Sequence, residues 1–256
     1  MSTYRGRGRG RGWIQDDKDP PPKPGNLLRT EDADCNTNLV DIVNSVTDEN
    51  LEQQAEEFIK LIDSDFKETY DKLHECARND KEFGQKLLRL VRRSRTHPQA
   101  ECAKSMGIFK YVINTVQNNY EERIKIRQEN TVQFYNDIYL LSELVTYFTS
   151  GCMMSCVLGA MLDYMEMLLE TASAEDIRMF TEQITVHGKL IGATHKIKMD
   201  ELMIMARQVL IKNDFSPTSR QMLLYAIDLV NQNFEPLPKN LQEFYELQLG
   251  KNFIQQ

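Results

Sequence analysis

Apolar side chains recur at helical spacing along most of the chain, and this regularity constrains the fold more than any other feature. The clearest stripe has successive spacings of four, three, four and three residues and consists of Phe134, Ile138, Leu141, Val145 and Phe148. This spacing places all its members on one face of an α-helix, whereas a half-buried strand requires strict alternation. No convincing strand-length run of period two follows residue 37. The sequence therefore predicts an all-α protein.

Helix start and stop signals divide the body of the chain into about ten helices of similar length. Their expected starts are Thr47, Asp65, Asp80, Pro98, Ser173 with Asp176, Asp200, Ser216 with Pro217, and Pro238. Ser, Thr and Asp cap helix N-termini through their side-chain oxygens, and Pro suits the first turn. Gly151 is placed to end the helix that carries the 134–148 stripe. The stretch from Pro98 to Arg127 is long enough to contain a bend.

The segment over about 154–169 is predicted to be the central helix, because it is apolar on more than one face. Asp163 and Glu166 interrupt the most apolar stretch, so we interpret it as core and not as a membrane span. Short connections make successive helices antiparallel. We therefore expect a HEAT-like stack of antiparallel helix pairs that forms a crescent, in preference to a compact bundle.

The N-terminus has a different composition from the rest of the chain. Residues 5–12 are four consecutive Arg-Gly dipeptides, and the only tryptophan, Trp13, follows them. Glycine at every second position disfavours a packed core and leaves the guanidinium groups available for phosphates and bases. The candidate RNA-binding residues here are Arg5, Arg7, Arg9, Arg11 and Trp13. We predict a disordered tail and Pro-rich linker over 1–36 and a helical domain over 37–256; the alternative for the tail is a linker without a partner.

Charge separates the tail from the body. Residues 1–29 carry seven Lys and Arg against three Asp, which leaves 24 basic against 35 acidic side chains in the remainder. An acidic body repels nucleic acid at long range and favours basic protein partners. Local basic clusters are the exception to this pattern. They are Arg89, Arg92, Arg93 and Arg95, and, interleaved with glutamates, Arg123, Lys125 and Arg127.

The two basic clusters receive different interpretations. Arg89, Arg92, Arg93 and Arg95 either complement the carbonyl end of their helix or hold RNA phosphate or an acidic partner loop, and both alternatives remain open. The cluster at 123–127 is expected to be a solvated face.

Residue types that support catalysis or metal binding occur without the necessary pattern. Glycines are scarce outside the N-terminus, and neither a phosphate-binding nor a dinucleotide-binding glycine loop occurs. We interpret Asp71 and His74 as a surface pair, and Cys152 and Cys156 as packing residues. The sequence thus predicts no enzymatic activity, no cofactor and no metal site. Five cysteines without framework spacing, and no cleavable signal, indicate a cytoplasmic or also nuclear location.

Several short segments resemble the middle domain of eukaryotic initiation factor 4G. They are Gln117–Glu121, Glu143-Leu144, Gly188-Lys189-Leu190 and, most specifically, Lys198-Met199-Asp200-Glu201-Leu202. The chain is most similar to short one-domain members of that superfamily, such as the poly(A)-binding-protein-interacting protein, the partner of the histone stem-loop-binding protein and the cap-binding-complex-dependent initiation factor. The resemblance spans roughly 37–250. It implies a HEAT-repeat crescent that acts as an adaptor in messenger RNA translation or turnover.

Two functional hypotheses follow. In the first, the chain is a non-enzymatic adaptor whose crescent binds translation or mRNA-turnover proteins and whose tail binds RNA. The resemblance implies the DEAD-box helicase initiation factor 4A or poly(A)-binding protein as partners, and no membrane is expected. In the alternative, the chain is an RNA-binding protein proper that uses the Arg-Gly tail and the Arg89–Arg95 cluster. Deletion of the tail separates these hypotheses.

Overall fold

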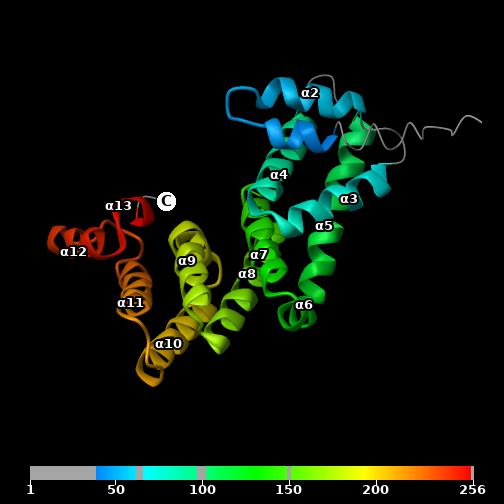
Figure 1. Cartoon of the computed structure of the whole chain (residues 1–256). Coiled ribbons are helices and arrows are strands. Elements are labelled where there is room, and N and C mark those ends of the chain that lie inside the picture. The colour runs from blue at the N-terminus through cyan, green and yellow to red at the C-terminus, as the bar shows by residue number, and fades with distance from the viewer. Residues whose placement is uncertain (1–38, 62–65, 97–101, 149–150, 255–256) are drawn as a thin grey trace, which may run out of the picture.

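The computed structural model of the chain describes residues 39–61, 66–96, 102–148 and 151–254 (Figure 1). All regular structure in these ranges is helical, without a strand, so the predicted all-α class is confirmed. The Arg-Gly tail and the expected helix starts at Asp65 and Pro98 lie outside the described residues.

Twelve labelled helices follow a short helical stretch over 39–45. In chain order they are α2 (Leu51–Leu61), α3 (Phe66–Asn79), α4 (Lys81–Thr96), α5 (Cys102–Glu121), α6 (Arg123–Glu129), α7 (Thr131–Val145), α8 (Cys152–Thr171), α9 (Ala174–Thr194), α10 (Lys196–Lys212), α11 (Pro217–Asn231), α12 (Lys239–Leu249) and α13 (Lys251–Ile254). The 39–45 helix was not predicted from the sequence, although its Leu39 and Val43 are fully buried.

Helices pack mainly on their neighbours along the chain. The principal contacts join α2 and α3 to α4, α4 to α5 and α7, α7 to α8, α8 to α9 and α10, α9 to α11, and α11 to α12. Figure 1 shows an extended arrangement that runs from α2 in blue to α12 and α13 in red at the opposite end. The buried apolar side chains accordingly fall into three clusters along the molecule.

α7 separates the two larger clusters, and its predicted stripe is confirmed at Phe134, Ile138, Leu141 and Val145, which are all buried. Leu140 contributes to the N-terminal cluster, whereas Leu141 contributes to the central one. The prediction for Gly151 was wrong. α7 ends at Val145 through tight backbone hydrogen bonds such as that from the Thr146 amide to the Glu143 carbonyl, and Gly151, with φ of 92°, is the N-cap of α8.

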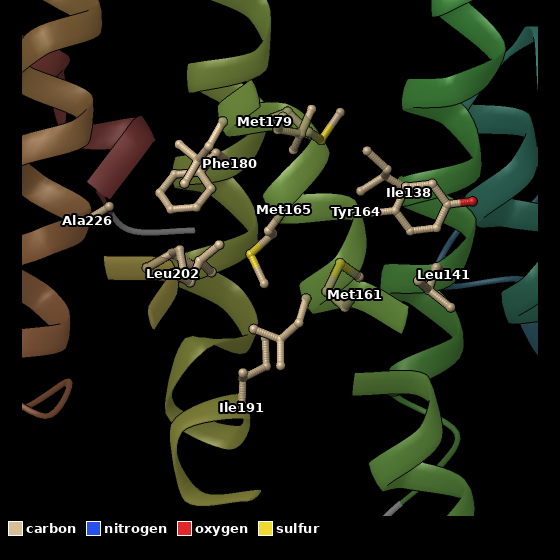
Figure 2. Close-up of a cluster of buried hydrophobic side chains, with 14 of the residues drawn as sticks. Ile138, Leu141, Met161, Tyr164, Met165, Met179, Phe180, Ile191, Leu202 and Ala226 are labelled. Atoms are coloured by element: carbon tan, nitrogen blue, oxygen red, sulfur yellow. The ribbon is translucent and has the colours of Figure 1, made fainter. Parts of the chain in front are cut away.

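α8 lies at the centre of the largest cluster, as its composition predicted. Figure 2 shows Met161 and Tyr164 of α8 beside Ile138 and Leu141 of α7, with Met165 directed toward the α9 and α10 side. Among the described helices, α8 is also the one whose length and composition would suffice to cross a membrane. In this fold, its apolar side chains from Val157 to Leu169 are largely buried against neighbouring helices.

Several predicted helix ends are confirmed by their hydrogen bonds. Ser173 and Asp176 form a reciprocal capping box at the start of α9, and Ser216 caps α11 with Pro217 in its first turn. The bend that the long stretch after Pro98 allowed is a break at Glu122, between α5 and α6.

The Gly188-Lys189-Leu190 segment has a clear steric basis. A Cβ atom added at Gly188 would lie 2.3 Å from Cζ of Phe234, so this glycine lets the end of α11 approach α9. Phe234 itself has a positive φ of 60°, which a large side chain adopts only when its surroundings hold it there. The contact between Gly188 and Phe234 thus fixes how the C-terminal helices join the central core.

Candidate binding surfaces

An apolar groove runs between α5, α7 and α8. It encloses roughly 200 Å³, and its lining is almost entirely apolar: Ile113, Val116, Gln117, Tyr120, Leu141, Leu144, Met153, Cys156, Val157 and Ala160. Leu141 and Leu144 form part of the buried core beneath it, whereas Met153 at its rim is 47% exposed. Contiguous apolar surface that remains open to solvent is a feature of protein and ligand interfaces.

Carboxylates follow the groove lining along α8, beyond Ala160. We use the name acidic ridge for Asp163, Glu166 and Glu170 of α8. The Tyr120 hydroxyl donates a hydrogen bond to Asp163 and closes the groove at this end. Burial, and then the neighbouring carboxylates Asp163, Glu170 and Glu201, raise the pKa of Glu166 above its ordinary value, although Lys198 opposes them.

Of the residues that the structure describes, Lys198 is the one basic side chain within 4.0 Å of a ridge carboxylate, at 3.7 Å between its Nζ and Oδ1 of Asp163. Like charges that lie close together repel each other, and this costs free energy that an approaching cation would recover. The Arg123 guanidinium also lies at this end, 4.2 Å from the centre of the Tyr120 ring. An apolar groove followed by three carboxylates along α8 suits a basic, amphipathic segment of a partner.

The arginines of α4 are placed differently. Arg89 forms an ion pair with Asp48, and Arg93 forms one with Glu52 at the start of α2. Arg92 approaches the Thr146 hydroxyl at 3.3 Å, and the Arg95 guanidinium lies 4.3 Å from the centre of the Phe109 ring. Each of the four candidate side chains therefore has an intramolecular contact, and carboxylates already neutralise Arg89 and Arg93.

Arg127 is not part of a solvated face, and that prediction was wrong for this residue. Its guanidinium donates to Asp176 at 2.6 Å, and the two side chains are 13% and 0% exposed. It also lies 4.5 Å from the centre of the Phe134 ring. Burial alone would raise the pKa of Asp176, but hydrogen bonds from Ser173, Arg127 and Thr171 hold it below its ordinary value.

The prediction of a surface pair at Asp71 and His74 was wrong for His74 only. His74 is only 8% exposed, and its Nε2 lies 3.1 Å from the Asn119 amide nitrogen, whereas Asp71 is exposed and accepts from the Tyr111 hydroxyl. Asn119 in turn donates to Asp137 at 2.9 Å. Burial lowers the pKa of His74 to about 4 and raises the pKa of Asp137 to about 6. These polar groups satisfy one another between α3, α5 and α7, so they link helices.

Cys152 and Cys156 are both exposed, so the expectation that they pack in the core was wrong. They lie in the first turns of α8, where Cys156 borders the groove, and a contact with Cys152 raises the pKa of the Cys156 thiol. No cluster of three or more metal-ligating side chains occurs within the described ranges.

The groove was not predicted from the sequence, although several residues that line it belong to the apolar stripes of three separate helices. Periodicity shows which face of a helix is apolar, but not where two apolar faces fail to meet. Of its candidate site residues, the structure places Arg89, Arg92, Arg93 and Arg95 on α4, whereas Arg5, Arg7, Arg9, Arg11 and Trp13 lie outside the described residues.

Comparison with known proteins adds no further assignment. No family model matches the chain, and no curated protein sequence is detectably similar to it. The resemblance to the middle domain of initiation factor 4G therefore stays a hypothesis based on the short segments quoted above.

Proposed function

We propose that the chain is a non-enzymatic adaptor in messenger RNA translation or its regulation, built as a HEAT-like crescent. In this proposal, the helical domain binds a translation or mRNA-turnover protein, and the Arg-Gly tail adds affinity for RNA. Its place of action is the cytoplasm, with the nucleus as a second location. The proposal combines the sequence resemblance with the surface features of the described helices.

One observation carries the proposal: the open apolar groove of α5, α7 and α8 ends at Tyr120, whose hydroxyl donates to Asp163, the first carboxylate of the acidic ridge. A groove of this kind suits the apolar face of a helix, with anchors at spacings of three and four residues. Lys and Arg beside those anchors would meet Asp163, Glu166 and Glu170. Initiation factor 4A and poly(A)-binding protein are the first candidates, because the resemblance points to them.

The tail has a separate, measurable role in this proposal. Each of Arg5, Arg7, Arg9 and Arg11 neutralises about one phosphate, and on single strands each contact contributes roughly 0.7 to the slope of log affinity against log salt concentration. Replacement of all four by Ser should therefore flatten that slope by about 2 to 3 and leave capture of the protein partner intact. Unchanged RNA affinity and slope would identify the tail as a linker.

An affinity pull-down from cytoplasm, with nuclease treatment, tests the adaptor function. Wild-type chain, a chain that lacks 1–36, and the double variant Met153→Arg with Ala160→Arg are compared. Protein partners should survive nuclease treatment and tail deletion but be lost from the double variant, because two arginines in the groove repel a basic segment. Purified initiation factor 4A and poly(A)-binding protein then test the two named candidates directly.

Val186→Arg on α9 provides a matched control. Val186 is 51% exposed, close to the 47% of Met153, but it lies outside the groove lining. Circular dichroism establishes that each variant is folded. Loss of every partner on nuclease treatment would instead favour the alternative, in which the chain is an RNA-binding protein proper.

A further inference from the structure

A second apolar surface, on α10, is independent of the groove. Ile197, Ile204 and Ile211 are 76%, 56% and 83% exposed, and they follow one another at intervals of seven residues. Seven residues are nearly two helical turns, so the three side chains lie along one face of the helix. Isolated exposed apolar residues are ordinary, but three β-branched side chains in a row form a continuous apolar strip of the kind that marks interaction sites.

Polar side chains alternate with these isoleucines. Glu201 and Gln208 are exposed and complete a row with spacings of four, three, four and three residues, which we name the isoleucine seam. Asp200 and Arg207 lie beside the seam, on the same flank of the helix at helical spacing. The Arg207 guanidinium donates to the Met203 carbonyl and to the side chain of Asn231 on α11, both neutral groups, so its positive charge is not paired with a carboxylate there. The opposite face of α10 packs inward through Met199, Leu202, Met203 and Ala206, so the seam points away from the core.

The order of residues along the seam is self-complementary when two copies run antiparallel. With Ile204 opposite Ile204 of the partner copy, a rise of about 1.5 Å per residue brings Ile197 level with Ile211. Glu201 then lies within one residue of Gln208, whose amide can donate to it, and Asp200 lies within one residue of Arg207. Every side chain of the seam thus meets one that it attracts.

A parallel pairing has no such complementarity. It would bring Asp200 and Glu201 of the two copies together at the same level, which is a like-charge contact on both flanks. A basic, amphipathic partner such as the one proposed for the groove also fits poorly here, because Arg207 and Lys212 lie in the C-terminal half of α10.

We propose that α10 is a self-association surface, through which two copies of this chain pair antiparallel about Ile204. The seam belongs to one helix of 17 residues, roughly 25 Å long, so the contact lies at the small end of specific interfaces. The dimer is therefore weak and depends on protein concentration. It leaves the groove of α5, α7 and α8 available, since none of the seam residues lines it.

Sedimentation equilibrium of the nuclease-treated full chain, across the micromolar concentration range, tests this proposal. Wild type should shift from monomer to dimer as concentration rises. Ile204→Glu places two carboxylates on the two-fold axis and should weaken dimerisation by more than about tenfold. Ile124→Glu on α6 is the matched control, because Ile124 is 59% exposed, similar to Ile204, and should leave dimerisation unchanged.

A charge exchange tests the antiparallel register. Asp200→Arg alone should weaken the dimer, because it meets Arg207 of the other copy, and the double variant Asp200→Arg with Arg207→Asp should restore it. A chain that stays monomeric throughout the range would overturn the proposal. So would a dimer that Ile204→Glu leaves intact, or one that Ile124→Glu weakens equally. Failure of the double variant to restore the dimer would overturn the antiparallel register.

Discussion

The basic side chains of α4 and α6 and the acidic side chains of α8 contrast in how the fold uses them. Arg89, Arg93 and Arg127 each pair with a carboxylate from another helix or its flanking turn. Along the acidic ridge of α8, Lys198 is the one basic side chain of the described residues that lies within 4.0 Å of a carboxylate. A cluster of charge in the sequence therefore does not identify a binding surface. What matters is whether the fold has already supplied the counter-charge.

This difference assigns separate roles to the two regions. The arginines stabilise contacts between helices, whereas the ridge keeps a net negative charge beside an open apolar groove. We infer that partner recognition occurs on the α8 side of the molecule. The following predictions test that contrast, from the largest expected effect to the smallest.

The largest effect is expected at Arg127, where the pairing is most buried. Arg127→Ala leaves Asp176 buried without its cation and should lower the free energy of unfolding by about 3 to 5 kcal/mol. Chemical denaturation measures this loss. Lys125→Ala, at an exposed position two residues away, should change stability by less than about 0.5 kcal/mol. If both variants lost similar, small amounts of stability, the ion pair of Arg127 with Asp176 would contribute no more than an exposed ion pair does.

The second prediction concerns the ridge. Glu166→Lys with Glu170→Lys should weaken capture of the protein partner by about tenfold or more, because it reverses the charge that attracts a basic segment. Fluorescence anisotropy or calorimetry with the purified partner measures the affinity. Glu243→Lys on α12 is an exposed acid outside the ridge and should have little influence. If both changes weakened capture of the partner equally, the ridge would act only through the net charge of the protein.

The third prediction concerns the pH dependence of partner affinity, and its expected effect is smaller. Because burial and neighbouring carboxylates raise the pKa of Glu166, it takes up a proton at higher pH than an isolated glutamate. Partner affinity should therefore fall as pH is lowered from neutral, starting above the ordinary range of glutamate. Glu166→Gln should bind more weakly at neutral pH and show a flatter profile. If affinity depended on pH in the same way in Glu166→Gln and in the wild type, Glu166 would not be the titrating group.

The smallest effect is expected at Arg89, whose side chain is 41% exposed beside an 80% exposed Asp48. Arg89→Ala should cost no more than about 1 kcal/mol of stability, because solvent screens exposed ion pairs. It should also leave RNA affinity unchanged, since Asp48 already neutralises this cation. A clear loss of RNA binding, measured in parallel with the tail variant, would revive the Arg89–Arg95 cluster as an RNA site.

The sequence predicted local features of the fold well and long-range contacts poorly, for physical reasons. The α7 stripe and the Ser173–Asp176 capping box depend on residues within a few positions of each other. By contrast, Arg127 and Asp176 are 49 residues apart, and only the packed structure shows that they meet. The exposure of Cys152 and Cys156 could not be predicted for the same reason, because the burial of a helix face depends on which neighbouring helix covers it.

The groove could not be predicted for a related reason. Its lining comes from α5, α7 and α8, and each of these helices shows an apolar stripe that is typical of core. A stripe indicates that a surface avoids water, but the position of the adjacent helices decides whether it is covered. The same holds for the seam of α10, where Ile197, Ile204 and Ile211 fit a helical pattern but remain exposed.

Hydrogen–deuterium exchange of the full chain, with and without the protein partner that survives nuclease treatment, tests the central claim most directly. We expect slower exchange over 113–121 and 152–171, which contain the α5 and α8 borders of the groove, and no change over 81–96 in α4. Protection that is confined to α4, with exchange in α5 and α8 unaltered, would contradict the assignment of partner recognition to the groove.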